Sequence, residues 1–137
     1  MSGINELIRT EEDGSLSFGN YELAAKGKVS GFEHAGDLYK VKTYSDITKL
    51  EKNEMFAYES TPGTVVTGYD QKESGLTFCV EGCKDTQVIV AVDDDAEYQV
   101  AVDGTVMEAG SMRLAGKLVL SLELEPGIRK SVSILKK

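Results

Sequence analysis

Apolar side chains alternate with polar ones along much of the second half of the chain. Five stretches carry this pattern or a continuous apolar run, at residues 76–81, 87–92, 97–103, 117–124 and 131–135. An apolar residue at every second position puts all of the apolar side chains on one face of a pleated strand. This half of the chain is therefore predicted to form an antiparallel β-sheet with one face in a core.

The run Val-Ile-Val-Ala-Val at 88–92 differs from the others because neither of its faces is polar. A strand that is apolar on both faces is typical of a position that is covered on both sides. We expect it at the centre of a sheet or at a contact between subunits. The three aspartates at 93–95 and the Asp103-Gly104 pair separate neighbouring strands and are typical of turns.

The first half of the chain shows shorter strand patterns and two candidate helices. Strands are predicted at 16–18, 21–23, 28–32, 37–44, 55–60 and 65–69, the first two joined as a hairpin through Gly19-Asn20. Ile4, Leu7 and Ile8 have the spacing of a helix face, with Ser2 as its N-cap. A second helical turn is expected near 46–52, with Ile47 and Leu50 pointing inward.

These patterns predict an all-β fold, an antiparallel β-sandwich that is immunoglobulin-like or jelly-roll-like, with a short N-terminal helix. The 137 residues suit one domain that can bury a core without disulfide bonds. We expect an N-terminal helix at 1–13, a first set of strands at 14–70 and a second set at 76–135, because no linker separates the two sets.

Composition narrows the range of partners and locations. Lys and Arg number 15 against 23 Asp and Glu, a net charge of −8, and the lysines are scattered, so nucleic acid is not expected as a partner. The N-terminus lacks a basic region followed by an apolar run, and no segment approaches the roughly 20 apolar residues that cross a bilayer. The sequence therefore predicts a cytoplasmic protein without membrane association.

The two cysteines, Cys79 and Cys83, are predicted to be free thiols. In one extended strand their Cα atoms would lie about 13 Å apart, which is too far for a disulfide bond. A turn at Gly82 would leave a local disulfide as the alternative. Two cysteines are also too few for a structural zinc site.

No group of residues predicts catalysis, a metal or a cofactor. The acidic run at 93–97 is contiguous, whereas a calcium loop places its ligands at alternating positions. His34 is the only histidine, which leaves no histidine pair for a metal. Tyr58 and Glu59 are neighbours on a strand and so point to opposite faces. We name no catalytic, cofactor-binding or metal-binding residue.

Two resemblances to known families can be stated. The segments 98–104, 116–124 and 132–134 resemble the end of immunoglobulin-like β-sandwich modules that are often attached to polysaccharide-active enzymes. The segment 40–53 with 58–63 resembles short bacterial proteins automatically labelled endosialidase. True endosialidases imply a multi-bladed propeller with Trp-containing repeats and an arginine cluster. This chain has no Trp, and we carry over no catalytic residue.

Three functions remain as hypotheses. The first is a non-catalytic structural or interaction protein that self-associates into a symmetric homo-oligomer, with Ile4, Leu7 and Ile8 as its association surface. The second is a carbohydrate-binding accessory module, which requires several tyrosines on one exposed face. The third is a small glycoside hydrolase, which requires a concave site with a carboxyl group of raised pKa. We favour the first hypothesis and do not expect an enzyme.

Overall fold

The structure, a computed structural model, describes residues 4–107 and 111–137. Its strands form two seven-stranded sheets in which every neighbouring pair is antiparallel. Sheet A has the order β1 (Ile8–Thr10), β2 (Leu16–Phe18), β7 (Val65–Lys72), β8 (Gly75–Glu81), β14 (Arg129–Lys136), β10 (Tyr98–Val102) and β11 (Thr105–Val106). Sheet B has the order β12 (Ser111–Leu114), β13 (Lys117–Leu122), β9 (Thr86–Ala91), β6 (Met55–Thr61), β5 (Ile47–Lys52), β4 (Asp37–Tyr44) and β3 (Gly27–His34). The prediction of an all-β, antiparallel protein is confirmed.

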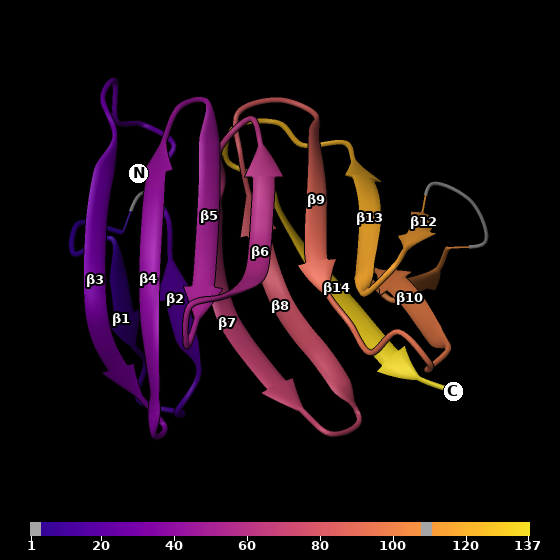
Figure 1. The fold of residues 1–137 in the computed structure, drawn as a ribbon. Coiled ribbons are helices and arrows are strands. Elements are labelled where there is room, and N and C mark those ends of the chain that lie inside the picture. Colours follow the sequence, from indigo (N-terminus) through magenta and orange to yellow (C-terminus); the bar gives the residue numbers. More distant parts are fainter. Residues whose placement is uncertain (1–3, 108–110) are drawn as a thin grey trace.

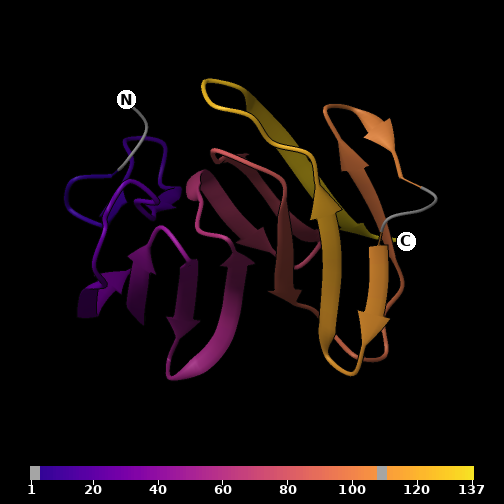
Figure 2. The ribbon, with the colours of Figure 1, turned by 90° about the horizontal axis from the view of Figure 1, so that it is seen from above.

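The two sheets face each other across an apolar core. Sheet B is the front layer in Figure 1, and the view from above in Figure 2 shows the two layers side by side. Tyr58 of sheet B lies edge-to-face against Phe18 and Phe78 of sheet A, with ring centroids 5.3 and 5.8 Å apart. Edge-to-face contacts are a favourable geometry for aromatic pairs, so these three rings join the layers at the centre.

Strands from both halves of the chain contribute to each sheet. In sheet A the hairpin β7–β8 joins the two halves, and in sheet B the pairing of β6 with β9 does so. The predicted alternation is visible along β4, where Tyr39, Val41 and Thr43 are buried and Lys40 and Lys42 point outward. The period of two therefore fixes which face of each strand enters the core.

The predicted N-terminal helix is wrong in the described part of the segment. Leu7 has a φ of +70°, a left-handed conformation that an α-helix does not contain. Its amide donates to the carbonyl of Ile4 in a turn, and Ile8 then begins β1, where it pairs with Phe18. Ser2, the predicted cap, lies outside the described residues. Three apolar residues in so short a segment fit a turn followed by a strand as well as a helix.

The helical turn predicted near 46–52 is also wrong, because these residues form β5. Thr48 and Leu50 point inward and are fully buried, while Lys49 and Glu51 point outward. The apolar spacing of Ile47 and Leu50 hid this alternation, since one of the two inward positions is a threonine. Across residues 4–107 and 111–137 there is no helix with the length and hydropathy of a membrane span.

The hairpin predicted at 16–23 does not form either. Residues 16–18 are β2, but this strand pairs with β1 and β7, and residues 21–22 lie in a turn. The amide of Glu22 donates a hydrogen bond to the Asn20 side-chain oxygen at 3.0 Å. Asn20 therefore shapes a turn that leads away from β2, where the sequence indicated a strand reversal.

Candidate functional site

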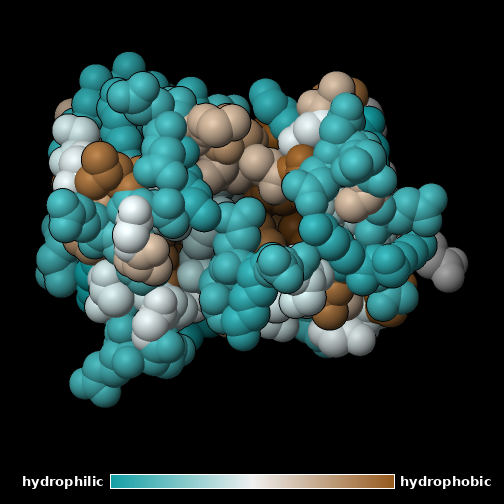
Figure 3. All heavy atoms as spheres, turned by 60° about the horizontal axis from the view of Figure 1, so that its bottom comes forward, coloured by the Kyte–Doolittle hydropathy of each residue, from teal (hydrophilic) through white to brown (hydrophobic). Residues whose placement is uncertain are grey.

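A cleft opens between the two sheets at the lower end of the molecule in Figure 1. Figure 3, in which this end comes forward, shows a hollow with a hydrophobic floor and a hydrophilic rim. The cleft has a volume of about 440 Å³ and is lined from β5, β7, β8, β9, β10 and β14. This volume lies within the range of small-molecule sites.

The floor of the cleft is built by the ends of core strands. Leu76 of β8 and Ile134 of β14 are direct cross-strand partners and are buried. Val92, directly after β9, completes the apolar surface from sheet B. The floor of the cleft is therefore the edge of the apolar core, which the cleft reaches between the two sheets.

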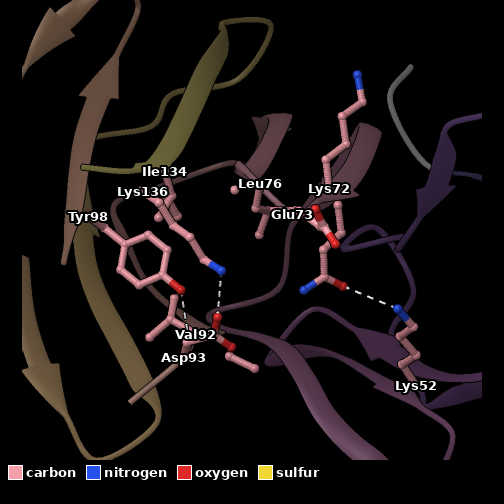
Figure 4. A pocket seen from close by; sticks show the side chains of 12 residues that line it. Lys52, Lys72, Glu73, Leu76, Val92, Asp93, Tyr98, Ile134 and Lys136 are labelled. Carbon is pink, nitrogen blue, oxygen red and sulfur yellow. Dashed lines mark hydrogen bonds and ion pairs between the residues drawn. The ribbon is translucent and has the colours of Figure 1, made fainter. Parts of the chain in front are cut away.

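One wall of the cleft is formed by Tyr98, Asp93 and Lys136 (Figure 4). The amide of Asp93 donates to the Tyr98 hydroxyl at 2.9 Å, and Lys136 Nζ lies 2.7 Å from Asp93 Oδ2. The hydrogen bond to Asp93 raises the pKa of Lys136. The guanidinium of Arg113 lies over the Tyr98 ring and donates to the carbonyls of Ala96 and Asp93 at 2.8 and 3.0 Å. The acidic loop after β9 is thus bound to the fold through its backbone.

The opposite wall carries Lys52, Lys72 and Glu73 (Figure 4), and Gln71 also lines the cleft. Lys52 Nζ lies 3.4 Å from the Gln71 side-chain oxygen and 3.6 Å from Asp37. Lys72 Nζ lies 3.3 Å from the carboxylate of Asp70, next along the same side of β7. The cations of this rim therefore already have partners inside the protein.

Carboxyl groups whose pKa is shifted all move downward. The pKa of Asp37 is lowered mainly by a hydrogen bond from Asn53, and that of Asp13 by a hydrogen bond from Ser15. The pKa of Glu11 is lowered by the nearby hydroxyl of Ser17 and by a hydrogen bond from Arg9 Nε at 3.0 Å. A general acid at neutral pH needs a shift in the opposite direction. The described residues also contain no group of three or more potential metal ligands.

The outer face of sheet B is the second candidate site. Val88 and Val90 of β9 point into the core and are fully buried, which turns Ile89 and Ala91 outward. Ile89 lies between two cross-strand partners, Val119 of β13 and Glu59 of β6. Ile89 is half-buried and Val119 is 7% exposed, although no further layer of the described residues lies over this face. The apolar half of this face, as we call it, consists of Phe56, Ile89, Ala91, Leu114 and Val119. Two charged residues lie among them: Glu59 opposite Ile89, and Lys117 opposite Ala91 with its Nζ 4.6 Å from the centre of the Phe56 ring. Leu114 is 53% exposed.

The other half of the same face is cationic. Lys28 of β3 pairs with Lys42 of β4, and Lys42 pairs with Lys49 of β5. Together with Lys40 these residues form what we call the lysine row. The sequence did not indicate the lysine row. Its members come from three strands, and only the folded structure shows that these strands are neighbours in the sheet.

The predicted association surface is not exposed. Ile4 and Ile8 are 3% and 2% exposed, and Ile8 belongs to the core, with Leu7 packed against it. The premise of an exposed apolar helix is therefore wrong. Their role in association stays a prediction, but any such role would need these side chains to leave the core.

The other singled-out residues are distant from a common site. His34 accepts or donates a hydrogen bond with Thr10 Oγ1 at 2.8 Å and does not line the cleft. Cys79 and Cys83 are both free, as predicted. Of the tyrosines, Tyr39, Tyr58 and Tyr69 are buried, and the other three, Tyr21, Tyr44 and Tyr98, lie on separate elements. They form no common platform for sugar rings.

Comparison with known proteins gives no relative for this fold and these surfaces. No protein-family model matches the chain, and neither a curated protein nor a solved structure matches it. The resemblances to endosialidase-labelled proteins and to immunoglobulin-like modules therefore stay predictions. The function has to be argued from the geometry alone.

Proposed function

We propose that the protein is a non-catalytic interaction protein that self-associates into a symmetric homo-oligomer through the apolar half of the outer face of sheet B. The observation that carries this proposal is the position of Ile89. It lies half-buried on a central strand, between Val119 on one side and Glu59 on the other, on a face that no other layer of the described residues covers. The outer face of an antiparallel sheet is ordinarily polar, so an apolar one favours a covering partner.

The strand β9 links this proposal to the sequence. Its run of five apolar residues at 88–92 is expected to be covered on both sides, and the fold covers only the side of Val88 and Val90. A second copy of the chain would cover the side of Ile89. The same patch then meets itself across a two-fold axis, as in most homodimers.

The lysine row restricts how two copies can pack. A two-fold axis that runs along β9 puts the two lysine rows on opposite flanks of the interface. An axis across the strands would bring the two rows face to face, and like charges in contact disfavour such a complex. We therefore expect the first arrangement.

The area of the patch indicates a weak complex. Four strands about 4.8 Å apart and about 20 Å long give a footprint of roughly 400 Å² per partner, half of the about 800 Å² in a standard interface. We expect monomer and oligomer to exchange in the micromolar range. The two free thiols, Cys79 and Cys83, support a reducing compartment such as the cytoplasm for this assembly.

The test is the mass of the protein by sedimentation velocity over a wide range of concentration. The wild-type mass should rise with concentration from 14.9 kDa to a multiple of it. Ile89→Lys should stay monomeric at every concentration and keep its unfolding transition. Leu135→Lys is the control, because Leu135 is an exposed apolar residue of sheet A. A wild-type protein that is monomeric throughout, or equal loss of association in both variants, would contradict the proposal.

Carbohydrate binding is a second candidate, and the ring of Tyr98 beside the cleft favours it. The ring faces polar groups such as Glu73 across the cleft, and an aromatic ring with polar groups in the same cleft is a usual arrangement for holding a sugar (Figure 4). Titration of the labelled protein with simple oligosaccharides, followed by NMR, should then shift signals of the cleft. The same titration of Tyr98→Ala should shift none. Unchanged spectra of the wild-type protein would remove this candidate.

A further inference from the structure

The lysine row brings together four positive charges on a chain that carries a net charge of −8. Lys28, Lys42 and Lys49 are direct cross-strand neighbours on β3, β4 and β5. Lys40 lies two residues before Lys42 and therefore on the same face. The four side chains and Glu51 line a surface depression of about 90 Å³.

Only part of this charge is balanced within the protein, since Glu51 lies directly across from Lys40 on β5. Lys49 pairs with Glu51, with 3.7 Å between Nζ and Oε2, and Glu59 lies across from Lys49 on β6. Lys28, Lys40 and Lys42 have no ion pair with any described residue. Like charges that lie directly opposite each other in a sheet are destabilising. A bound anion would relieve the repulsion between Lys28 and Lys42 and between Lys42 and Lys49.

Protection of a sheet edge does not account for the row. Lysines on an edge strand keep other chains from adding to the sheet, and Lys28 on β3 has that position. Lys42 and Lys49, however, lie on β4 and β5, which are paired on both sides. Their charges point out of the plane of the sheet and guard no edge.

We propose that the lysine row is a binding site for a compact oxyanion with several charges, a phosphate or sulfate ester, and that Lys42 is its central contact. Side chains opposite each other in a sheet are about 5 Å apart, so neighbouring ammonium groups can donate to different oxygens of one such group. A long polyanion is disfavoured by the net charge of −8, which repels it outside the row. The depression accommodates only a small group.

The test is titration with sodium pyrophosphate at constant ionic strength, followed by calorimetry and by thermal unfolding. Wild-type protein should bind with a saturable heat and unfold at a higher temperature as pyrophosphate rises. Lys42→Gln should bind about tenfold more weakly. Lys84→Gln makes the same change of charge at an exposed position away from the row and should bind as the wild type does.

A second readout is independent of the ligand. Without any anion, Lys42→Gln should unfold at a temperature equal to or above that of the wild type, because the substitution removes repulsion. Repetition with sodium sulfate and with sodium phosphate identifies the source, since these anions have one central atom each, and tighter binding of phosphate assigns a phosphate ester whereas tighter binding of sulfate assigns a sulfate ester. The absence of saturable binding, or an equal loss in Lys42→Gln and Lys84→Gln, would overturn the proposal.

This site is separate from the proposed association surface. Ile89→Lys should bind pyrophosphate like the wild type, and Lys42→Gln should keep the dependence of mass on concentration. Failure of one proposal would therefore leave the other standing.

Discussion

The two ends of the space between the sheets are closed in different ways. At the upper end in Figure 1, near the β4–β5 turn and residues 61–64, buried hydroxyl groups bond to one another. At the lower end the edge of the core forms the floor of the cleft, and exposed charged side chains surround it. One end of the space between the sheets is therefore closed by buried hydroxyl groups, and the other is open and lined by exposed charges.

The hydroxyl network at the closed end is centred on Thr48 and Thr64. Thr48 Oγ1 donates to the Thr64 carbonyl at 2.9 Å and accepts from the Thr64 amide at 3.0 Å. Because the single proton of Thr48 is used there, Thr43 must donate the 2.8 Å bond that joins the two threonine hydroxyls. Thr64 Oγ1 in turn bonds to the hydroxyls of Tyr58 and Ser60, at 2.8 Å each.

The two ends are expected to differ in how strongly a substitution changes the stability of the protein. All five side chains of the network are fully buried, so a lost partner cannot be replaced by water. The ion pairs of the cleft are exposed, and water can replace each of them. Stability should therefore depend on the closed end, while the open end can change to suit a ligand.

The largest effect is expected for Thr48→Val. The substitution keeps the shape of the side chain but removes bonds to Thr43 and to both backbone groups of Thr64. Leaving these groups buried and unpaired should lower the free energy of unfolding by about 3 kcal/mol. Urea denaturation measures the change.

A matched control for that variant is Thr77→Val, because Thr77 lies exposed on β8. It should change the free energy of unfolding by less than about 0.5 kcal/mol. An equal loss in both variants would show that the network adds nothing beyond the intrinsic preference of each site.

The second effect is a loss of stability at alkaline pH that depends on Tyr58. Burial raises its pKa from 10.0 to about 12. The folded protein therefore holds this proton while the unfolded chain releases it. The resulting stabilisation is complete below about pH 10 and is lost as pH rises toward about 12, at about 1.4 kcal/mol per pH unit.

Tyr58→Phe isolates this contribution. Burial also raises the pKa of Tyr69, and the charges of Tyr39 and Tyr58 raise it further, so Tyr58→Phe keeps the burial effect on Tyr69 and removes only the part that comes from Tyr58. Urea denaturation at several pH values should show a shallower decline for Tyr58→Phe than for the wild type. Identical slopes would contradict the assignment of the shifted pKa to Tyr58.

The sequence predicted the strands better than it predicted either end of the molecule. Alternation along residues 37–44 was enough to place Tyr39, Val41 and Thr43 inside. It failed at 46–52, because the short spacing of Ile47 and Leu50 fits two periods. The hydroxyl network could not be predicted, since threonines and serines distant in sequence carry no periodic signal. The cleft and the lysine row depend on strand order, which the sequence leaves open.

The smallest effect is expected at the open end, for Lys136→Gln. Its ion pair with Asp93 is short, at 2.7 Å, but both side chains are exposed, by 38% and 60%. Because Asp93 raises the pKa of Lys136, the stabilisation is present at neutral pH, complete below the ordinary lysine pKa of 10.5, and lost only as pH rises through the raised value. The loss on substitution should be small at low salt and should disappear at about 1 M salt, where charges are screened within about 3 Å. Urea midpoints at the two salt concentrations measure it. A loss of stability as large as that of Thr48→Val, and equal at both salt concentrations, would mean that the exposed ion pair contributes as much to stability as the buried hydroxyl network.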